Sequence, residues 1–355
     1  MKKFITAFLL LSGLIVQPLF SQTDSIISPV AISDTQDVDI RLFDSDEPLD
    51  IALRFDITYY KRKKPDTSYM DAILTYYTGD KDSVNKNIKI KARGEVRRTI
   101  CDFPPLFLNF KMKDSLPGEF IGINKLKVVP YCKIGYEDYV LREYLVYKLY
   151  NILTDNSLKV RLFRINFINT AKATKPLRQF GFAIEPLKLY EKRTNSLELE
   201  KAKLSRNYIK PEMLDRCAIF NYMIGNTDWS VPNQHNCKIL ISTMPDRAST
   251  GIIVPYDFDY SGLINATYAV PHESLPIETV RERLFQGLCR SDEEFLSILG
   301  EFAAKKEAFY DVINNFPYLD EKEKKSMISY LDQFFDGINK RNSILYDIKQ
   351  NCKDL

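Results

Sequence analysis

The side chains best suited to chemistry lie in two segments, IGNTDWSVPNQHNCKIL and GIIVPYDFDYSG, between residues 224 and 262. Asp228 follows an apolar helical stretch, and Asn236 opens a strand eight residues later. Asp257 and Asp259 end a second strand, where alternation predicts that both face the same side. If the two strands pair as a hairpin, Asn236 and Asp257 converge near its ends.

Carboxylate and carboxamide oxygens are hard ligands, which Mg²⁺ prefers, with phosphates and water completing its shell. A further carboxylate beside the metal can orient or deprotonate a hydroxyl. Two other interpretations stay open, since clustered Asn and Asp are mostly caps and Asx-turns, and a glycosidase with paired carboxylates leaves no local motif. A calcium loop is excluded, because an EF-hand that opened at Asp257 would require Glu where Tyr268 stands.

The elements that must position these residues change character along the chain. From about 38 to 132, short runs with alternation or with β-branched and aromatic residues predict strands. Residues 136–153 carry an apolar stripe at helical spacing, formed by Leu141, Tyr144, Leu145, Leu149 and Ile152. After Pro186 the pattern is mainly helical, with a short β insert. A β-rich front half and a helical back half predict an α+β chain with two lobes and a cleft between them.

Start and stop signals mark the helices of the back half. Pro211 and Gly225 bound the first of them, and Ser291 with Glu294 resembles a capping box for the second. The predicted helices are 211–225, 292–314 and 321–350.

The order of these segments resembles the CotH-type kinase family, named for spore coat protein H. The resemblance covers roughly residues 88–265 and rests on KARGEVRR, LKVVPYC with the helix after it, a strand pair ending in Glu185, GNTDWS with the HN that follows it at 235–236, and DFD. It implies a two-lobed protein-kinase-like fold, with a β-rich N-lobe at 38–186 and a mainly helical C-lobe at 187–355. It also implies a secreted, atypical kinase-like transferase that uses ATP with Mg²⁺ or Mn²⁺ on protein Ser or Thr hydroxyls.

The resemblance implies roles for the polar residues of the second half. Asp228 would be the catalytic carboxylate that accepts the proton of the acceptor hydroxyl. Asn236 and Asp257 would hold the metal against the nucleotide phosphates, with Asp259 as a further ligand.

The front half would supply the nucleotide contacts. Lys127 would meet the phosphates and pair with Glu143 in the helix, as kinase chemistry requires, and Lys111 is the alternative lysine. Arg93 and Gly94 would border the phosphates, because a Gly after a strand lets backbone N–H groups approach an anion. Glu185 would lie between the lobes or at the surface. The chain departs from the family at Glu95-Val96, where the Arg-Gly loop usually continues with Asn-Ser.

A second class of function remains beside the transferase. A kinase-like fold can persist without activity, as a binding or surface-assembly module. The scarcity of free ATP outside cells favours this alternative, because the chain is expected to be exported.

The expectation of export comes from residues 1–21, which have the pattern of a cleaved signal peptide. Lys2 and Lys3 precede an apolar run at 4–16, too short to span a bilayer, and small Ser21 precedes Gln22. Residues 22–37 are expected to be a tether. The mature chain is therefore expected in the periplasm, at the cell surface or outside the cell, without a transmembrane segment.

The net charge of the chain gives no support for a nucleic-acid partner. Lys+Arg 50 against Asp+Glu 47 gives +3, and Lys2 and Lys3 of the leader supply two of these charges. A mature chain so close to neutral gives no argument for nucleic-acid binding. The expected partners are a nucleotide and a protein acceptor, and the oligomeric state is open.

Six cysteines fit an oxidising compartment, with 15 possible full connectivities. Cys101 and Cys132 flank two short candidate strands and are the first pair to test. A structural zinc site is disfavoured, because the chain has no C-x-x-C and only two histidines.

Overall fold

The computed structural model describes residues 40–78, 82–111, 117–200, 204–244 and 250–354, and Asp39–Leu355 form one compact unit. The predicted signal peptide at 1–21 and the predicted tether at 22–37 lie outside these described residues. None of the described helices is both long enough and apolar enough to cross a membrane.

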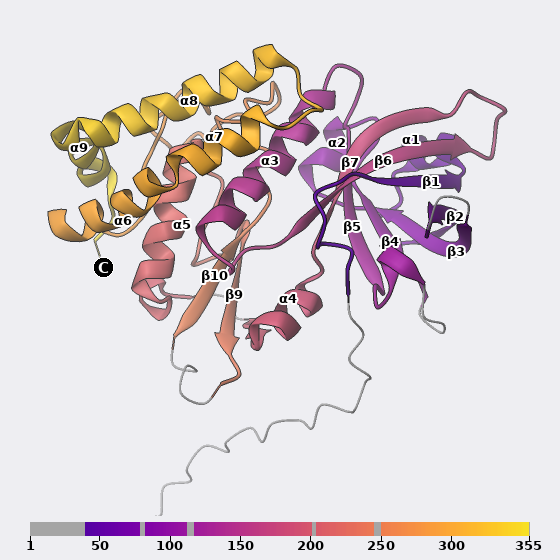
Figure 1. Ribbon diagram of the computed structural model, residues 1–355, viewed down its shortest axis with the longest axis horizontal. Helices are drawn as coiled ribbons and strands as arrows, with labels where there is room; N and C mark the ends of the chain where they lie inside the picture. The colour runs from indigo at the N-terminus through magenta and orange to yellow at the C-terminus, as the bar shows by residue number, and fades with distance from the viewer. Residues whose placement is uncertain (1–39, 79–81, 112–116, 201–203, 245–249, 355) are drawn as a thin grey trace, which may run out of the picture. The chain divides into compact units, whose positions relative to one another are not determined.

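Seven strands of the first half close into a barrel, in the order β1-β2-β3-β4-β5-β7-β6 (Figure 1). The barrel closes because β1 pairs in parallel with β6, from Leu49 opposite Phe163 to Phe55 opposite Asn169. Alternate side chains turn inward into an apolar core, as Leu53 and Phe163 do. The strands are β1 (Leu49–Phe55), β2 (Met70–Tyr77), β3 (Ser83–Ala92), β4 (Leu106–Asn109), β5 (Lys125–Pro130), β6 (Val160–Asn169) and β7 (Leu177–Ile184).

The predicted two-lobed protein-kinase-like fold is wrong, because the N-terminal strands form this closed barrel. Short alternating strands look the same in an open sheet and in a barrel, so the pattern identified strands without their closure. Closure depends on the β1–β6 pairing, which joins segments far apart in the sequence and removes the sheet edges. The predicted boundary between residues 186 and 187 falls between β7 and α4.

The second half contains helices and a three-stranded sheet of order β10-β9-β8. Its elements are α4 (Leu187–Thr194), β8 (Ser196–Glu198), α5 (Pro211–Ile224), β9 (Cys237–Ser242), β10 (Gly251–Pro255), α6 (Asp292–Ala304), α7 (Lys306–Asn314), α8 (Glu321–Asn339) and α9 (Arg341–Asn351). β9 and β10 form the antiparallel hairpin on which the convergence of Asn236 and Asp257 depends. Gly225 ends α5 in a left-handed conformation with a φ of 67°, and the capping box of Ser291 and Glu294 is confirmed. The two long predicted helices are each divided, at Lys305 and Lys340.

Helix α3 (Glu137–Leu153) lies between the barrel and the helices of the second half (Figure 1). It packs against β6 and β7 on the barrel and against α7. The predicted stripe is confirmed, because Leu141, Tyr144, Leu145 and Leu149 are all buried. One helix therefore carries side chains that face both halves.

Two short helices, α1 (Ile57–Lys63) and α2 (Val96–Ile100), were missed by the sequence pattern. The run DIALRFDITYY is a strand only to Phe55, because the Asp56 side chain accepts a bond from the N–H of Tyr59 and begins α1. The hydroxyl of Tyr60 in α1 donates to the C=O of Pro104 at 3.0 Å. This hydrogen bond connects α1 to the residues that follow α2.

A disulfide joins Cys101 to Cys132 and confirms the predicted pair. It connects the end of α2 to the residues between β5 and α3. A second disulfide joins Cys289 to Cys352, and Cys217 and Cys237 are free and buried.

Candidate functional site

The β9–β10 hairpin brings Asn236 and Asp257 together at its open end. The N–H of Tyr256 donates to the C=O of Asn236 at 2.9 Å. The side-chain Nδ2 of Asn236 donates to Oδ2 of Asp228 at 2.8 Å. Asp228 in turn is close enough to Asp257 for its charge to raise the pKa of that carboxyl. Three predicted site residues from separate segments therefore lie in one group.

The backbone is left-handed at both Asn236 and Asp257, with φ values of 49° and 62°. β10 ends at Pro255, so strand alternation does not apply to Asp257, and that part of the prediction is wrong. The left-handed turn nevertheless directs Phe258 into the core. Asn and Asp adopt this conformation more readily than other non-glycine residues, so both side chains suit the turns in which they stand.

Asp228 is held at both carboxylate oxygens. His235 Nε2 lies 2.9 Å from Oδ1, and Asn236 binds Oδ2. The N–H of Asp228 donates to the side chain of Asn226, just beyond α5, at 3.1 Å. The side chains of Asp228 and Asp257 are 39% and 41% exposed, so a ligand can reach both. Asp228, His235, Asn236 and Asp257 are termed the open polar group.

A second cluster is enclosed. Arg97 in α2 contacts Oε2 of Glu143 through Nη2 at 2.5 Å and Oδ2 of Asp259 through Nε at 2.7 Å. Tyr268 donates its hydroxyl to the same Asp259 oxygen at 3.1 Å. The Arg97, Glu143 and Asp259 side chains are only 11%, 2% and 8% exposed. These three residues are termed the buried charge network.

One guanidinium in this network serves more than one carboxylate, because Arg97 also lies 3.8 Å from Asp257. Burial raises the pKa of Glu143, Arg97 opposes this, and the charges of Asp259 and Asp257 add to the rise. Burial and the Asp259 carboxylate likewise raise the pKa of Asp257. Three carboxylates around one cation leave an excess of negative charge, which favours a proton or another cation nearby.

The implied pairing of Lys127 with Glu143 is wrong, because Arg97 occupies Glu143. Lys127 lies in β5 with Nζ 5.8 Å from the ring centre of Tyr256, and it has no ion-pair partner among the described residues. Burial, together with the charges of Arg93 and Lys238, lowers the pKa of Lys127 to about 8. The alternative, Lys111, lies exposed beyond β4, where its charge acts on Asp71.

Lys127 and Asp257 face one narrow cavity of about 30 Å³. Its lining comprises Arg93, Lys127, Val129, Tyr147, Leu158, Ile184, Glu185, Leu187, Lys238, Tyr256 and Asp257. A volume of this size holds water and no nucleotide.

Two of the charged residues in this lining already have partners. Arg193 holds Glu185 at 2.8 Å, and Glu198 holds Lys238 at 2.6 Å. Arg93 and Lys127 are cations without an acidic partner at this distance among the residues that the structure describes. A small anion in the cavity would therefore be attracted by both side chains.

Gly94 and Glu185 complete the predicted set. Gly94 has a φ of 85° and lies exposed at the turn into α2. Glu185 is buried, and its Oε2 also accepts a bond from the N–H of Lys159 at 3.0 Å. Glu185 directly follows β7, and this bond ties it to Lys159, the residue before β6.

Sequence reasoning gave no role to Arg97, His235 or Tyr147. Tyr147 lies one turn beyond Glu143 in α3, and its hydroxyl accepts a bond from the N–H of Asp257 at 2.9 Å. Nothing in KARGEVRR distinguishes Arg97 from Arg98, because the partners of Arg97 are 46 and 162 residues away. His235 belongs to the His-Asn pair that follows GNTDWS, and only its neighbour Asn236 was given a role.

Within the described part of the chain, no group of three or more His, Cys, Asp or Glu side chains is arranged to hold a metal ion. The open polar group offers two carboxylates and one carboxamide. That donor set fits Mg²⁺, which takes one or two carboxylates and completes its shell with phosphates and water.

Comparisons with known proteins add little. No protein-family model matches the sequence, and no curated protein matches it. Among solved structures, the proinflammatory kinase CtkA of Helicobacter pylori is similar at 13% identity, over 59% of this chain and 86% of CtkA, with a TM-score of 0.35. A TM-score this low carries no argument, and the CotH-type family is not shown.

Replacing Arg97 with Met should destabilise the protein by about 3–5 kcal/mol, because Glu143 and Asp259 would stay buried without a counter-ion. The matched control is Arg164→Met, which breaks an exposed pair with Asp50 and should cost about 0–1 kcal/mol. Urea unfolding gives both free energies. Equal losses in the two variants would contradict a special role for the buried charge network.

Replacing Lys127 with Met should stabilise the protein at pH 7 by about 1–3 kcal/mol. The pKa of Lys127 is about 8 in the folded chain, against 10.5 for an ordinary lysine, so its charge opposes folding at neutral pH. As pH rises from 8 to 10.5 the lysine loses its proton, and the advantage of Met should fade. Unfolding free energies across this range test the prediction. Lys125→Met, at an exposed site of the same strand, is the control, and the same trend in both variants would count against burial as the cause.

Proposed function

We propose that the chain is a phosphotransferase that uses ATP with Mg²⁺ or Mn²⁺ and phosphorylates Ser or Thr hydroxyls of a protein acceptor. One observation carries the proposal. Arg93 and Lys127, which have no acidic partner in the part of the chain that the structure describes, line the same cavity as Asp257 of the open polar group. Such cations suit phosphates, and the oxygens of the open polar group suit the divalent ion that accompanies them.

Each residue would have a defined task. Asn236 and Asp257 would hold the metal, while Lys127 and Arg93 contact the phosphates at the turn where Gly94 leaves the backbone accessible. Asp228 would accept the proton of the attacking hydroxyl, oriented by His235. When bound, the nucleotide would supply the phosphoryl group, and the divalent metal ion would neutralise part of the phosphate charge.

Asp259 is predicted from the sequence as a further ligand of the metal. Both Arg97 and Tyr268 bind its Oδ2, so Oδ1 is the oxygen that would remain for a cation. Glu143 would act through Arg97, by fixing α2 beside the loop after β10. Through their pairing with Arg97, these two carboxylates would help to fix the position of Asp257 in the open polar group.

A second candidate function is a binding or surface-assembly module without catalysis. The cavity of about 30 Å³ favours it, because a nucleotide requires the cavity to widen first. The pairing of Glu143 with Arg97 favours it as well, since the lysine–glutamate pair of active kinases is not formed.

We propose further that the chain is exported through a cleaved leader to the periplasm, the cell surface or the medium. The disulfides Cys101–Cys132 and Cys289–Cys352 support this, because such bonds persist in oxidising compartments. The exported protein should begin at Gln22 when its N-terminus is sequenced. A chain that keeps residues 1–21 outside the cell would contradict cleavage.

Calorimetric titration of the purified protein with ATP and Mg²⁺, and separately Mn²⁺, separates the two functions. We expect metal-dependent binding that falls about tenfold or more in Asp257→Asn, because that substitution removes a charged ligand. Asp311→Asn, at an exposed position of α7, is the matched control and should bind normally. Absence of nucleotide binding in the unmodified protein would favour the module without catalysis.

Transfer of labelled phosphate to the protein itself or to casein tests the role of Asp228. We expect Asp228→Asn to lose about 100-fold or more of the labelling while it keeps nucleotide affinity, because only the proton acceptor is removed. Normal labelling by this variant would remove Asp228 from the catalytic role.

A further inference from the structure

Four basic side chains line one hollow at an end of the barrel. Lys61 and Arg62 come from α1, and Lys172 and Lys175 come from the connection between β6 and β7. The hollow measures about 550 Å³, within the range of about 300–1,000 Å³ that is usual for ligand sites. No acidic residue of the described chain lines it, and neither does any residue of the open polar group. It is termed the basic hollow.

Asn169 holds the two basic segments together. β1 and β6 run in parallel with Phe55 opposite Asn169, so α1 and the β6–β7 connection leave the barrel at the same end (Figure 1). Oδ1 of Asn169 accepts bonds from the N–H groups of Ile57 and Ala171, each at 3.1 Å. Its Nδ2 donates to the hydroxyl of Thr58 at 3.0 Å. The fold therefore fixes the two segments that carry the cations beside each other.

The four charges are uncompensated and accessible. None of the four side chains forms an ion pair with a described residue. Arg62, Lys172 and Lys175 are exposed, and Lys61 is half-buried with Nζ 5.7 Å from the ring centre of Phe103. A ligand in the hollow can therefore contact the charged groups themselves. Neighbouring cations repel one another, and a concave surface of one sign concentrates ligands of the opposite sign.

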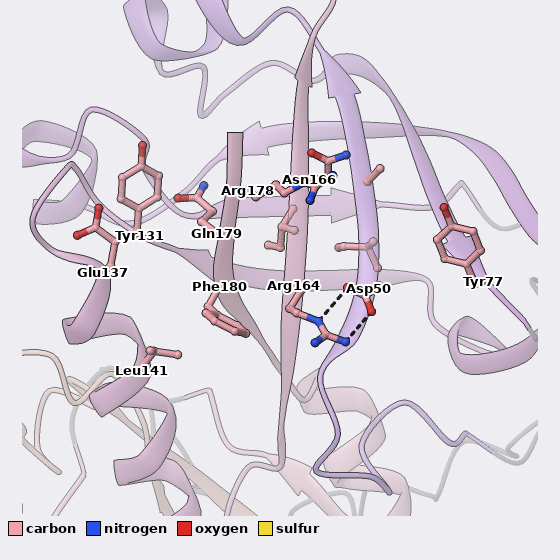
Figure 2. Close-up of a pocket in the computed structure, with 13 residues that line it drawn as sticks. Asp50, Tyr77, Tyr131, Glu137, Leu141, Arg164, Asn166, Arg178, Gln179 and Phe180 are labelled. Atoms are coloured by element: carbon pink, nitrogen blue, oxygen red, sulfur yellow. Dashed lines mark hydrogen bonds and ion pairs between the residues drawn. The ribbon is translucent and has the colours of Figure 1, made fainter. Parts of the chain in front are cut away.

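A larger cavity on the barrel, of about 770 Å³, differs in this respect (Figure 2). There Arg164 binds Asp50 through two hydrogen bonds of 2.9 and 2.7 Å. Arg178 and Glu137 add one charge of each sign to the same lining. The excess of positive charge is therefore a property of the basic hollow, and the larger cavity does not share it.

We propose that the basic hollow binds an acidic segment of a protein partner. Three of its four cations are lysines, which act as point charges on flexible stems. Cations spread over two segments suit several carboxylates spaced along a chain, whereas a single phosphate is usually held by converging donors that are fixed in place. Leu177, half-buried in the same lining, offers an apolar contact beside the charges. The proposal does not depend on phosphotransferase activity.

Other polyanions match the basic hollow less well. A bilayer surface is flat and a nucleic-acid duplex is stiff, so each would meet the rim of a hollow and leave its interior unfilled. A single nucleic-acid strand also stacks its bases on exposed aromatic rings. The aromatic residue of this lining, Phe167, is buried and offers no such ring.

The test measures binding of a short synthetic peptide of alternating Glu and Ser around a central Leu. It is made at about 0.15 M salt, where distant charges are screened. Two double variants each remove one of the basic segments, Lys61→Gln with Arg62→Gln and Lys172→Gln with Lys175→Gln. We expect about tenfold weaker binding in each, because two ion pairs with the peptide are lost together.

The matched control is Lys322→Gln with Lys325→Gln, which removes the same charge from exposed positions of α8. Its affinity should change less than about twofold, because the net charge falls equally and only the place differs. A second control is the peptide with Gln in place of every Glu, which should not bind.

Thermal unfolding gives an independent readout. Removing neighbouring cations should leave the Tm equal or higher, since Gln forms helices about as well as Lys and Arg. A lower Tm in both hollow variants would show that the cations already have partners, and would overturn the premise.

The binding measurements can overturn the proposal in three further ways. The unmodified protein may fail to bind the acidic peptide, or the control variant may lose as much affinity as the hollow variants. Vesicles of phosphatidylglycerol or single-stranded DNA could also bind in place of the peptide. No nucleotide is present in these measurements, so their outcome leaves the phosphotransferase proposal to its own tests.

Discussion

The guanidinium of Arg97 holds together the segments from which the candidate site is built. It contacts Glu143 of α3 at 2.5 Å and Asp259 after β10 at 2.7 Å. Its own helix is fixed to the β5–α3 connection by the Cys101–Cys132 disulfide. Buried charges are costly unless they are paired, so this network stabilises one arrangement of α2, α3 and the loop after β10. Asp257 lies in that loop, so the network also fixes the position of its accessible carboxylate oxygens.

The separation of charge follows from this arrangement. Arg97 pairs with the buried carboxylates, whereas Lys127 and Arg93, which line the cavity, have no acidic partner among the described residues. Burial lowers the pKa of Lys127 to about 8, and the positive charges of Arg93 and Lys238 add to this effect. Charges left uncompensated inside a protein are a cost to folding, and they persist where a ligand of opposite charge is used. The pairing at Arg97 thus leaves Arg93 and Lys127 as cations without an acidic partner among the described residues, beside the accessible oxygens of the open polar group.

The sequence predicted the pairing of neighbouring strands better than the closure of the barrel. Strand pattern placed Asn236 and Asp257 at the ends of one hairpin, because pairing between consecutive strands is local. The barrel was missed, because β1 pairs with β6 across most of the first half and alternation does not reveal the partner of a strand. Arg97 was missed for a similar reason, since its carboxylate partners are distant in sequence and three arginines stand in the same short segment. Long-range pairing, of strands or of charges, is what local pattern cannot specify.

The closed barrel also limits how the cavity can widen. β5, which carries Lys127, is paired with β4 on one side and β7 on the other, so Lys127 cannot move away by itself. The opposite wall comes from Leu187, Lys238 and Tyr256 of the second half. Widening therefore has to move this wall relative to the barrel while Arg97 keeps Glu143 and Asp259 paired, because their separation would leave buried charges uncompensated.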